Sequence, residues 1–223
     1  MNFKFLQKVF LSTLLLVFLA LPSTASEIPS WNSLLRKYGR DKNVRTVIFV
    51  QHTGGSNAQV LLYGKSEEDA WTLLLQCEGF VGKNGLSSDR HEGDGTTPMG
   101  DFGVIEAIGI KKNPASKIPY RTADKDLFCG SDEKNYNTIV SKRQTGHVCD
   151  ETCAHIYDTS PQFNYAIFLD FNKERIMGKG SGIFLHCAGP NSYTAGCVAV
   201  SEENMKRILQ LVDKNVRICI FPK

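Results

Sequence analysis

The sequence lacks several features that would place it in a common functional class. Beyond its N-terminal segment it has no apolar run long enough to cross a bilayer, and it has no internal repeat or low-complexity tract. Its 223 residues carry a formal net charge of only +3, which is too mild to favour a nucleic-acid binder. The composition, 42% hydrophobic and 22% charged, excludes a disordered chain and predicts a globular protein with one domain.

Glycine is present without a nucleotide-binding pattern. Residues 82–100 combine glycine with charged residues, but they lack the Lys-Ser/Thr pair and the following helix of a phosphate-binding loop. We interpret this stretch as a structured loop in which Glu92 and Asp94 accept hydrogen bonds from backbone N–H groups, rather than as a catalytic carboxylate pair. The sequence therefore predicts no nucleotide and no other cofactor.

The N-terminus has the layout of a secretory signal peptide. Lys4 and Lys8 precede an apolar run over residues 9–21, and small residues follow up to Ala25. As a helix this run would rise only about 20 Å, less than the roughly 30 Å of a hydrocarbon core, so an uncleaved anchor is the weaker alternative. We expect a signal peptide at residues 1–25 and a protein exported to the periplasm or the extracellular cell envelope, without a stable membrane anchor.

The remaining chain divides into a polar lead-in, residues 26–43, and one domain, residues 44–223. Ser201 can cap an amphipathic helix that ends around Asp213. Residues 111–160 show little periodicity and predict a long insertion that covers one face. A short helix is expected over residues 31–38, and strands over residues 45–50, 58–63, 70–75, 164–169, 182–186 and 216–221.

The segment from His186 to Cys197 carries the clearest chemistry. His186 ends one apolar run, Cys197 begins another, and a turn-rich loop separates them. Such a loop can bring the two side chains together at neighbouring strand ends, where the imidazole takes the thiol proton and creates a nucleophile. Gly196 permits a tight turn that aims backbone N–H groups near Ala195 at a developing oxyanion, which makes acyl transfer possible.

Three motifs taken together resemble the L,D-transpeptidase catalytic domain, also called YkuD-like. They are EGDGTTPMGDF at residues 92–102, GSGIFLH at residues 180–186 and TAGCVA at residues 194–199. The resemblance extends from about residue 47 to residue 212. It implies a mainly β fold, a sandwich or barrel with a few short helices.

The resemblance also implies roles for individual residues. Cys197 would be the nucleophile and His186 its base, with an oxyanion hole formed by the backbone at Gly196 and Ala195. A backbone carbonyl that follows the histidine commonly orients the imidazole in this family, which here indicates Cys187 or its neighbour. Substrate contacts are expected from Tyr120, Arg121, Tyr136, Asn137 and His155.

The implied reaction is peptidoglycan crosslinking. Cys197 would attack the amide after the third residue of a tetrapeptide stem, release the terminal D-alanine and form a thioester, which an amine of a second stem resolves. If water resolves the thioester, the protein is an L,D-carboxypeptidase. The expected partners are peptidoglycan stem peptides and no nucleic acid, and no metal is required.

The sequence departs from the commonest family pattern, Ser-His-Gly-Cys followed by a hydrophobic residue and Arg. Ala195 takes the place of the second histidine, and Ala199 takes the place of the arginine. This agrees with a branch of the family that has Thr-Ala-Gly-Cys. The departure leaves the nucleophile in place and weakens any substrate contact inferred from the main branch.

The cysteines allow other interpretations. Cys197 could be disulfide-bonded in a non-catalytic wall-binding protein, because cysteines of exported proteins usually pair. With Cys197 reserved, six of the seven cysteines remain, and fifteen connectivities are open. We expect Cys129 to pair with Cys149 or Cys153. A metal site in the cluster His147, Cys149, Cys153 and His155 is the alternative, although its spacing matches no common zinc module.

Overall fold

The computed structural model describes residues 28–146 and 154–222 of the chain. The predicted signal peptide, residues 1–25, lies outside the described residues, as do three members of the predicted metal or disulfide cluster: His147, Cys149 and Cys153. Strands dominate and helices are few and short, so the predicted mainly β fold is confirmed. Within the described ranges, no helix has the length and apolar character that crossing a bilayer requires.

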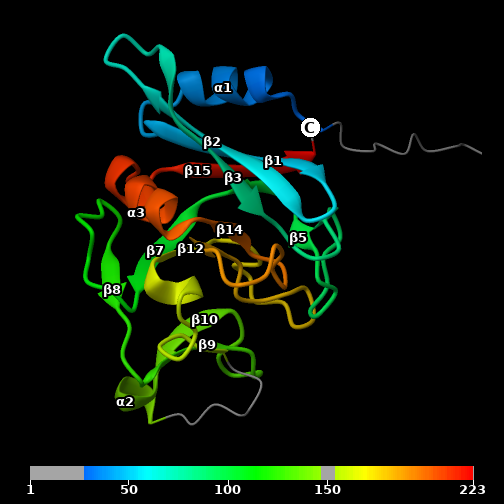
Figure 1. Cartoon of the computed structure of the whole chain (residues 1–223), viewed down its shortest axis with the longest axis vertical. Coiled ribbons are helices and arrows are strands. Elements are labelled where there is room, and N and C mark those ends of the chain that lie inside the picture. Colours follow the sequence, from blue (N-terminus) through cyan, green and yellow to red (C-terminus); the bar gives the residue numbers. More distant parts are fainter. Residues whose placement is uncertain (1–27, 147–153, 223) are drawn as a thin grey trace, which may run out of the picture.

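The fold is built on one large curved sheet (Figure 1). The strands are β1 (Thr46–Gly54), β2 (Asn57–Lys65), β3 (Trp71–Phe80), β4 (Leu86–Ser87), β5 (Thr97–Pro98), β6 (Gly100–Phe102), β7 (Val104–Gly109), β8 (Tyr120–Thr122), β9 (Leu127–Gly130), β10 (Thr138–Ser141), β11 (Ala154–His155), β12 (Ala166–Leu169), β13 (Phe184–Cys187), β14 (Val198–Val200) and β15 (Arg217–Pro222). The helices are α1 (Trp31–Gly39), α2 (Lys142–Thr145), the 3₁₀ turn η1 (Gln162–Asn164) and α3 (Glu202–Leu211). Ten strands pair in the order β6-β15-β1-β2-β3-β14-β13-β12-β7-β8.

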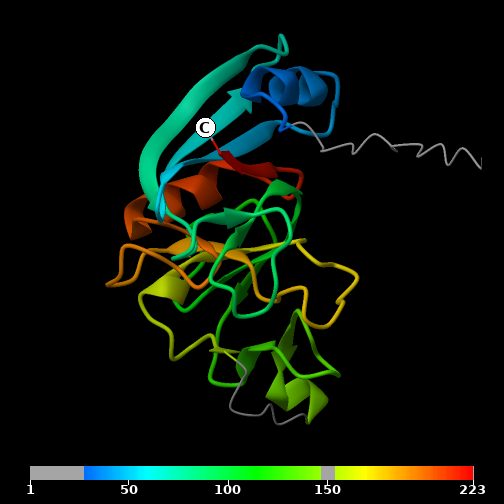
Figure 2. The same cartoon turned by 90° about the vertical axis from the view of Figure 1, so that its right-hand side faces the viewer.

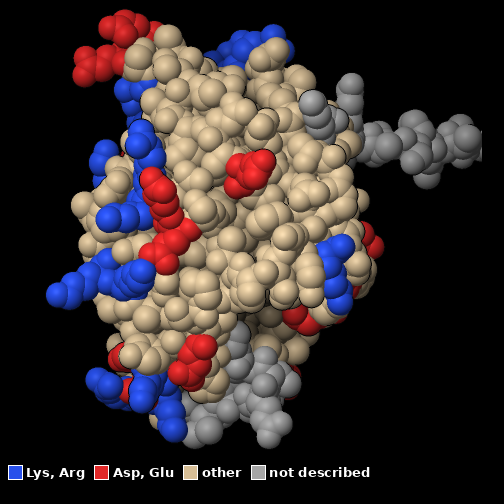
Figure 3. All heavy atoms as spheres, in the orientation of Figure 1, with Lys and Arg blue, Asp and Glu red and all other residues tan. Residues whose placement is uncertain are grey.

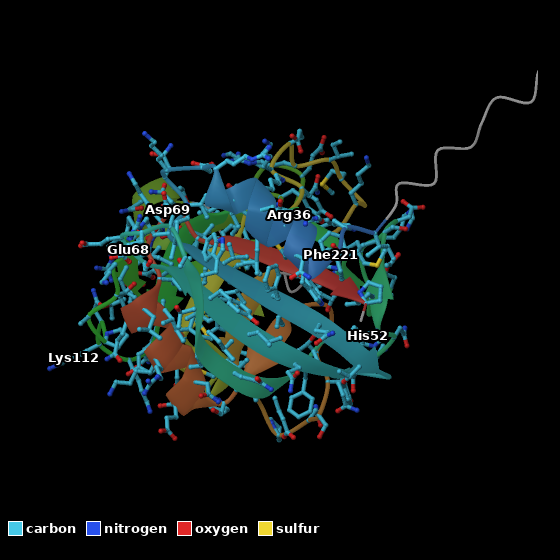
Figure 4. The ribbon with its side chains drawn as sticks, turned by 90° about the horizontal axis from the view of Figure 1, so that it is seen from above. Arg36, His52, Glu68, Asp69, Lys112 and Phe221 are labelled. Carbon is cyan, nitrogen blue, oxygen red and sulfur yellow. The ribbon has the colours of Figure 1, made fainter. Side chains whose placement is uncertain are left out.

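Helix α1 confirms the helix predicted over residues 31–38, and it covers the outer face of the sheet at β1. Figure 4, seen from above, shows α1 lying across β1 and β15. The Trp31 ring packs on Phe49 of β1 with a centroid distance of 4.6 Å, and Tyr38 is buried. The buried ammonium of Lys65 donates hydrogen bonds to the carbonyl of Tyr38 in the last turn of the helix (2.9 Å) and to that of Asp41 just beyond it (2.7 Å). These contacts join the lead-in firmly to the domain.

Helix α3 fills the concave side of the sheet. Ser201 accepts a hydrogen bond from the Asn204 N–H and caps the helix, as the sequence predicts. Met205, Ile208 and Leu209 lie on one face and are fully buried in the main core. The helix thereby supports the strands that carry the candidate site, β13 and β14, from the core side.

The insertion, residues 111–160, contains a small sheet that the sequence did not predict. Strands β10, β9 and β11 pair in that order, and each has only two to four residues, too few for a periodic signal. Leu127 and Cys129 of this sheet pack in one cluster with Phe168 and Phe184 of the large sheet. Figures 1 and 2 place this unit at the opposite end of the molecule from α1.

The edge of the large sheet at β8 is charged. Figure 3 shows basic side chains gathered where α3 and β8 lie in Figure 1, with acidic side chains among them. Arg121 of β8 pairs with Glu106 of β7 at 2.9 Å, and Lys111 pairs with Glu202 at the start of α3. Charges on an edge strand disfavour pairing with another sheet.

Candidate active site

The sheet brings His186 and Cys197 to one cleft. His186 lies in β13, and Cys197 immediately precedes β14, which runs parallel to β13 with Leu185 opposite Val198. Both residues line a cleft of about 300 Å³. The structure thus places both residues along one cleft, and a direct contact between their side chains stays a prediction from the sequence.

The imidazole of His186 is fixed on two sides. Its Nδ1 lies 2.7 Å from the carbonyl oxygen of Cys187, so the tautomer that donates this hydrogen bond carries its lone pair on Nε2. The ring of Phe163 in η1 stacks on it at a centroid distance of 5.7 Å. Burial lowers the pKa of His186 below its usual value, although the bond to Cys187 favours the charged form. The ring is therefore a neutral acceptor at neutral pH.

The thiol of Cys197 is held as a neutral group. Its Sγ donates to the carbonyl of Gly182 at 3.3 Å and accepts from the N–H of Phe184 at 3.4 Å. Burial raises the pKa of Cys197 to about 11, against the smaller opposing effects of the Phe184 N–H and of the charge on Arg90. Within the described residues, no hydrogen bond joins Sγ to the His186 ring, so the thiol proton must be redirected from Gly182 before the imidazole can take it.

Two threonines fix the cysteine turn, residues 194–197. The carbonyl of Cys197 accepts hydrogen bonds from the hydroxyls of Thr194 (2.6 Å) and Thr97 (3.1 Å). Thr97 is fully buried and also accepts from the N–H of Gly82 at 2.8 Å. Both threonines belong to motifs quoted from the sequence, but only the fold shows that their hydroxyls hold the cysteine turn.

The same turn determines which backbone donors remain for an oxyanion. The N–H of Gly196 donates to the Thr194 hydroxyl at 3.0 Å and is thereby engaged, whereas Ala195 is exposed and lines the cleft. Gly196 has φ +150°, a conformation that other L-residues rarely adopt. The remaining candidate donors in this turn are the N–H groups of Ala195 and Cys197.

Two segments form the walls of the cleft. The insertion and η1 supply one wall, and the loop between β13 and β14 supplies the other. Tyr193 on the loop wall is 48% exposed, which leaves the cleft open to solvent. Together with His186 and Cys197, the lining residues are Thr159, Gln162, Phe163, Gly189, Pro190, Asn191, Tyr193, Thr194, Ala195 and Ala199.

The model of the L,D-transpeptidase catalytic domain family, YkuD, matches residues 56–220. The chain belongs to this family. The match shows that the chain contains an L,D-transpeptidase catalytic domain, and members of this family are typically associated with the cell envelope. The comparison with curated proteins returned no match.

One solved structure shows a distant likeness. It is the crystal structure of Mycobacterium tuberculosis L,D-transpeptidase 1, with 13% identity and a TM-score of 0.36. The aligned region covers 80% of this chain and 62% of that chain.

Five residues for which the family resemblance implied substrate contacts are not among those that line the cleft. Tyr120 donates from its hydroxyl to the carbonyl of Lys111 at 2.7 Å, and Arg121 is paired with Glu106. His155 is exposed in β11, where its ring lies 6.2 Å from that of Phe128. All three side chains lie on the insertion or at the sheet edge.

Tyr136 and Asn137 are buried and support the site from behind. The Tyr136 hydroxyl donates to Glu92 and accepts from the N–H of Gly180 at 3.0 Å. The side-chain oxygen of Asn137 accepts from the N–H of Gly182 at 2.9 Å. These bonds hold the segment before β13, whose Gly182 carbonyl contacts the Cys197 thiol. The structure gives both residues a supporting position instead of a place in the cleft.

The described cysteines are free thiols: Cys77, Cys129, Cys187, Cys197 and Cys219. The expected pairing of Cys129 with Cys149 or Cys153 is therefore wrong, because Cys129 is buried in the cluster beneath β13 and unpaired. Cys197 is also unpaired, which removes the disulfide on which the wall-binding interpretation depended. No group of three or more metal-ligating side chains occurs in the described ranges, and most of the suspected cluster lies outside them.

Proposed function

We propose that this protein is a peptidoglycan L,D-transpeptidase that acts through a thioester on Cys197. The observation that carries the proposal is the shared cleft of Cys197 and His186, with the imidazole oriented by the carbonyl of Cys187. An unpaired thiol and a neutral imidazole are the pair that cysteine-dependent acyl transfer requires. Family membership supports the peptidoglycan stem as the donor.

In the first half-reaction the thiol proton passes to Nε2 of His186 and Sγ attacks the carbonyl carbon of the amide after the third stem residue. The carbonyl oxygen becomes an oxyanion within reach of the N–H groups of Ala195 and Cys197. When the C–N bond breaks, the imidazolium gives its proton to the amine of the departing D-alanine. Cys197 then carries the stem as a thioester, and His186 is neutral again.

In the second half-reaction a neutral amine of another stem attacks the thioester carbonyl. His186 accepts the proton that the amine loses, and the C–S bond breaks to restore the thiolate, which regains the proton. The product is an amide between two third-position residues. Tyr193 and Ala195 on the rim of the cleft are exposed, which is consistent with access for an acceptor from solvent.

Hydrolysis at the same thioester is the second candidate function. The observation that favours it is the open cleft, because a rim with a half-exposed Tyr193 does not exclude water. An L,D-carboxypeptidase would share the acylation step and release a tripeptide stem. A non-catalytic wall-binding protein would perform neither step.

The test is to incubate the protein with muropeptides that carry tetrapeptide stems and to identify the products by mass spectrometry. Crosslinked dimers together with free D-alanine are expected for the wild type, and none for Cys197→Ser. Cys77→Ser is the matched control, because Cys77 is a half-buried free thiol on β3 outside the cleft, and its products should equal those of the wild type. Tripeptides without dimers would indicate the carboxypeptidase. Undiminished product from Cys197→Ser would refute the proposed mechanism.

We also propose that residues 1–25 are a signal peptide and that the protein is exported. The support is the basic start, the apolar run and the small residues before Ser26 in the sequence. N-terminal sequencing of protein expressed in a bacterial host and recovered from its envelope should give Ser26 as the first residue. An intact Met1 on envelope protein would contradict cleavage.

A further inference from the structure

A buried arginine lies directly behind the cysteine turn. Arg90 is only 7% exposed and comes from the glycine-rich loop that joins β4 to β5. Its Nη1 forms an ion pair with Asp94 at 3.1 Å and donates to the carbonyl of Thr96. Its Nε has no hydrogen-bond partner, and it is one of two such buried side-chain atoms among the described residues. A buried charged donor without a partner is costly, which calls for an explanation of its position.

The arginine touches the cysteine turn at Gly196. A Cβ placed on Gly196 would overlap the guanidinium of Arg90 and would lie 2.8 Å from the carbonyl oxygen of Thr96. On its other side, a Cβ on Gly180 would lie 2.8 Å from Nε. The guanidinium is thus enclosed between two glycines, one in the segment before β13 and one directly before Cys197. Absence of side chains at both positions is what allows so close an approach.

The charge on Arg90 acts on Cys197 with little screening. Among the described residues, the titratable and charged groups near the Cys197 thiol are His186, which lines the same cleft, Cys129 from β9, and Arg90, whose ionic partner is Asp94. Burial raises the pKa of Cys197, and the positive charge of Arg90 opposes this rise. Charges interact more strongly in a buried site than in water, because the local dielectric constant is lower.

The neutralisation of Arg90 is incomplete. Its only ionic contact among the described residues is Asp94. Asp94 also accepts hydrogen bonds from the N–H groups of His91 and Thr96 and from the Thr96 hydroxyl, and these bonds spread its charge over the loop. Asp94 reaches one nitrogen of the fork instead of two. A partly neutralised cation next to a group that becomes an anion during acylation stabilises that anion.

We propose that Arg90 is a positioning residue for the acyl-transfer site: it fixes the Gly196 turn and stabilises the thiolate of Cys197 as it forms. This inference rests on the proposed function, in which Cys197 is the nucleophile. It places a positive charge beside the nucleophile from a loop that is distant in the sequence, whereas Ala199 stands two positions after the cysteine, where the commonest family pattern has arginine.

The test measures the rate at which iodoacetamide alkylates Cys197, by peptide mass spectrometry, between pH 6 and 10. Arg90→Gln should shift the curve of rate against pH to higher pH by about one unit, so that alkylation of Cys197 at pH 8 slows about tenfold. Arg90→Lys, which keeps a charge, should restore most of the rate. Arg217→Gln is the matched control, because Arg217 also pairs with a partly buried aspartate, Asp101, at the far β15–β6 edge, and its curve should equal that of the wild type.

A variant with the opposite sign separates electrostatics from misfolding. Asp94→Asn removes the partner charge and leaves Arg90 in place, so Cys197 should be alkylated about threefold to tenfold faster at pH 8. Damage to the loop that exposed Cys197 would also lower the pKa of the thiol, so the thermal unfolding curve of Asp94→Asn must match that of the wild type for the faster alkylation to count. If Arg90→Gln fails to fold, as judged by circular dichroism, the alkylation rate of Asp94→Asn alone tests the role of Arg90.

The inference would be overturned if Cys197 in a folded Arg90→Gln variant were alkylated at the wild-type rate. It would also be overturned if Cys197 in Asp94→Asn were alkylated at the wild-type rate or more slowly. Alkylation needs no peptidoglycan, so the result stands apart from the product assay. If muropeptides give no product with the wild type while Arg90→Gln still shifts the curve, the proposed function fails and the electrostatic role of Arg90 remains. If products form and the curve of Arg90→Gln does not move, the proposed function stands and the electrostatic role of Arg90 fails.

Discussion

Two arginine–aspartate pairs in this protein differ in how completely the arginine is hydrogen-bonded. Arg217 donates from Nε to a carboxylate oxygen of Asp101 and from Nη2 to the Asp101 carbonyl, both at 2.9 Å. Asp101 also accepts from Lys37 of α1 at 2.9 Å and from Tyr38. Arg90 reaches Asp94 through a single nitrogen and leaves its Nε unpaired. The first pair, Arg217 with Asp101, is well hydrogen-bonded and joins α1 to β15, and we call it the clamp. In the second pair the positive charge of Arg90 is only partly neutralised and lies next to the cysteine turn.

The carboxylates show what this difference means for stability. Burial alone would raise the pKa of Asp101, but the hydrogen bonds from Tyr38 and Lys37 and the charge of Arg217 outweigh it and lower the pKa. A carboxyl group with a lowered pKa stabilises the fold above its unfolded pKa, near 3.8, and this stabilisation is lost as the pH falls through the folded value. The clamp therefore contributes to folding at all but acidic pH.

Gly196→Ala should have the largest effect, because it forces a side chain between the cysteine turn and Arg90. The new Cβ would overlap the guanidinium, and φ +150° is strained for alanine. Displacement of Cys197 by even about 1 Å should reduce acylation about a hundredfold or more. The product assay with tetrapeptide muropeptides measures this loss.

Gly146→Ala is the control for that substitution. Gly146 also has positive φ, +66°, but nothing lies within 4 Å of a Cβ placed there. It should cost about 1–2 kcal/mol of stability through backbone strain and leave the acylation rate unchanged. Equal acylation rates for the two variants would show that crowding by Arg90 does not matter.

Asp101→Asn should weaken the clamp without touching the site. Loss of a charged hydrogen-bond acceptor shared by Lys37, Tyr38 and Arg217 should lower the free energy of unfolding by about 2–3 kcal/mol, measured by urea denaturation. The alkylation rate of Cys197 at pH 8 should stay at the wild-type value. Asp69→Asn, in an exposed pair with Arg45 at 3.9 Å, should change stability by less than about 1 kcal/mol. Slower alkylation of Cys197 in Asp101→Asn would show that the Arg217–Asp101 pair also acts on the site, and it would contradict the difference drawn between the two pairs.

The pH dependence of the site has a definite sign. Because the pKa of Cys197 is raised to about 11, its alkylation rate should rise about tenfold per pH unit up to the limit of stability. Because the pKa of His186 is lowered from 6.5, its neutral form persists below that pH, and the acid limb of kcat/KM should lie below 6.5. An alkylation rate that is already constant at pH 7 would show a preformed thiolate and contradict the neutral pair.

Tyr136→Phe should have the smallest effect on the reaction itself. It removes the hydrogen bonds to Glu92 and from the Gly180 N–H, which should cost about 1–2 kcal/mol of stability. Since Tyr136 is buried behind the site, KM for the muropeptide should not change. A large rise in KM with unchanged stability would restore the substrate role expected from the family resemblance.

The sequence predicted the periodic parts of the fold well. Helices α1 and α3 have capping serines, Ser30 and Ser201, and one apolar face each, and both appear close to their expected bounds. The strands with apolar runs also appear in place. The small sheet of β10, β9 and β11 was missed, because strands of two to four residues leave no period to detect.

The candidate site was predictable only where its residues are close in sequence. His186 and Cys197 flank one loop, and the motif around each is specific. Arg90 was not recognised, because its role depends on contact with Gly196 across the fold. Tyr136 and Asn137 were expected at the substrate because they lie in a stretch that resembles the family, whereas the structure shows them buried and hydrogen-bonded to residues 180–182.

The most direct test of the central claim is to locate the acyl group on the protein. The wild type is mixed with a tetrapeptide muropeptide, quenched in acid within seconds, digested and analysed by tandem mass spectrometry. The account predicts that the peptide containing Cys197 carries the added mass of the stem acyl group. None of the other six cysteines of the chain should carry it. An acyl group on a different residue, or product formation from a Cys197→Ala variant at the wild-type rate, would contradict it.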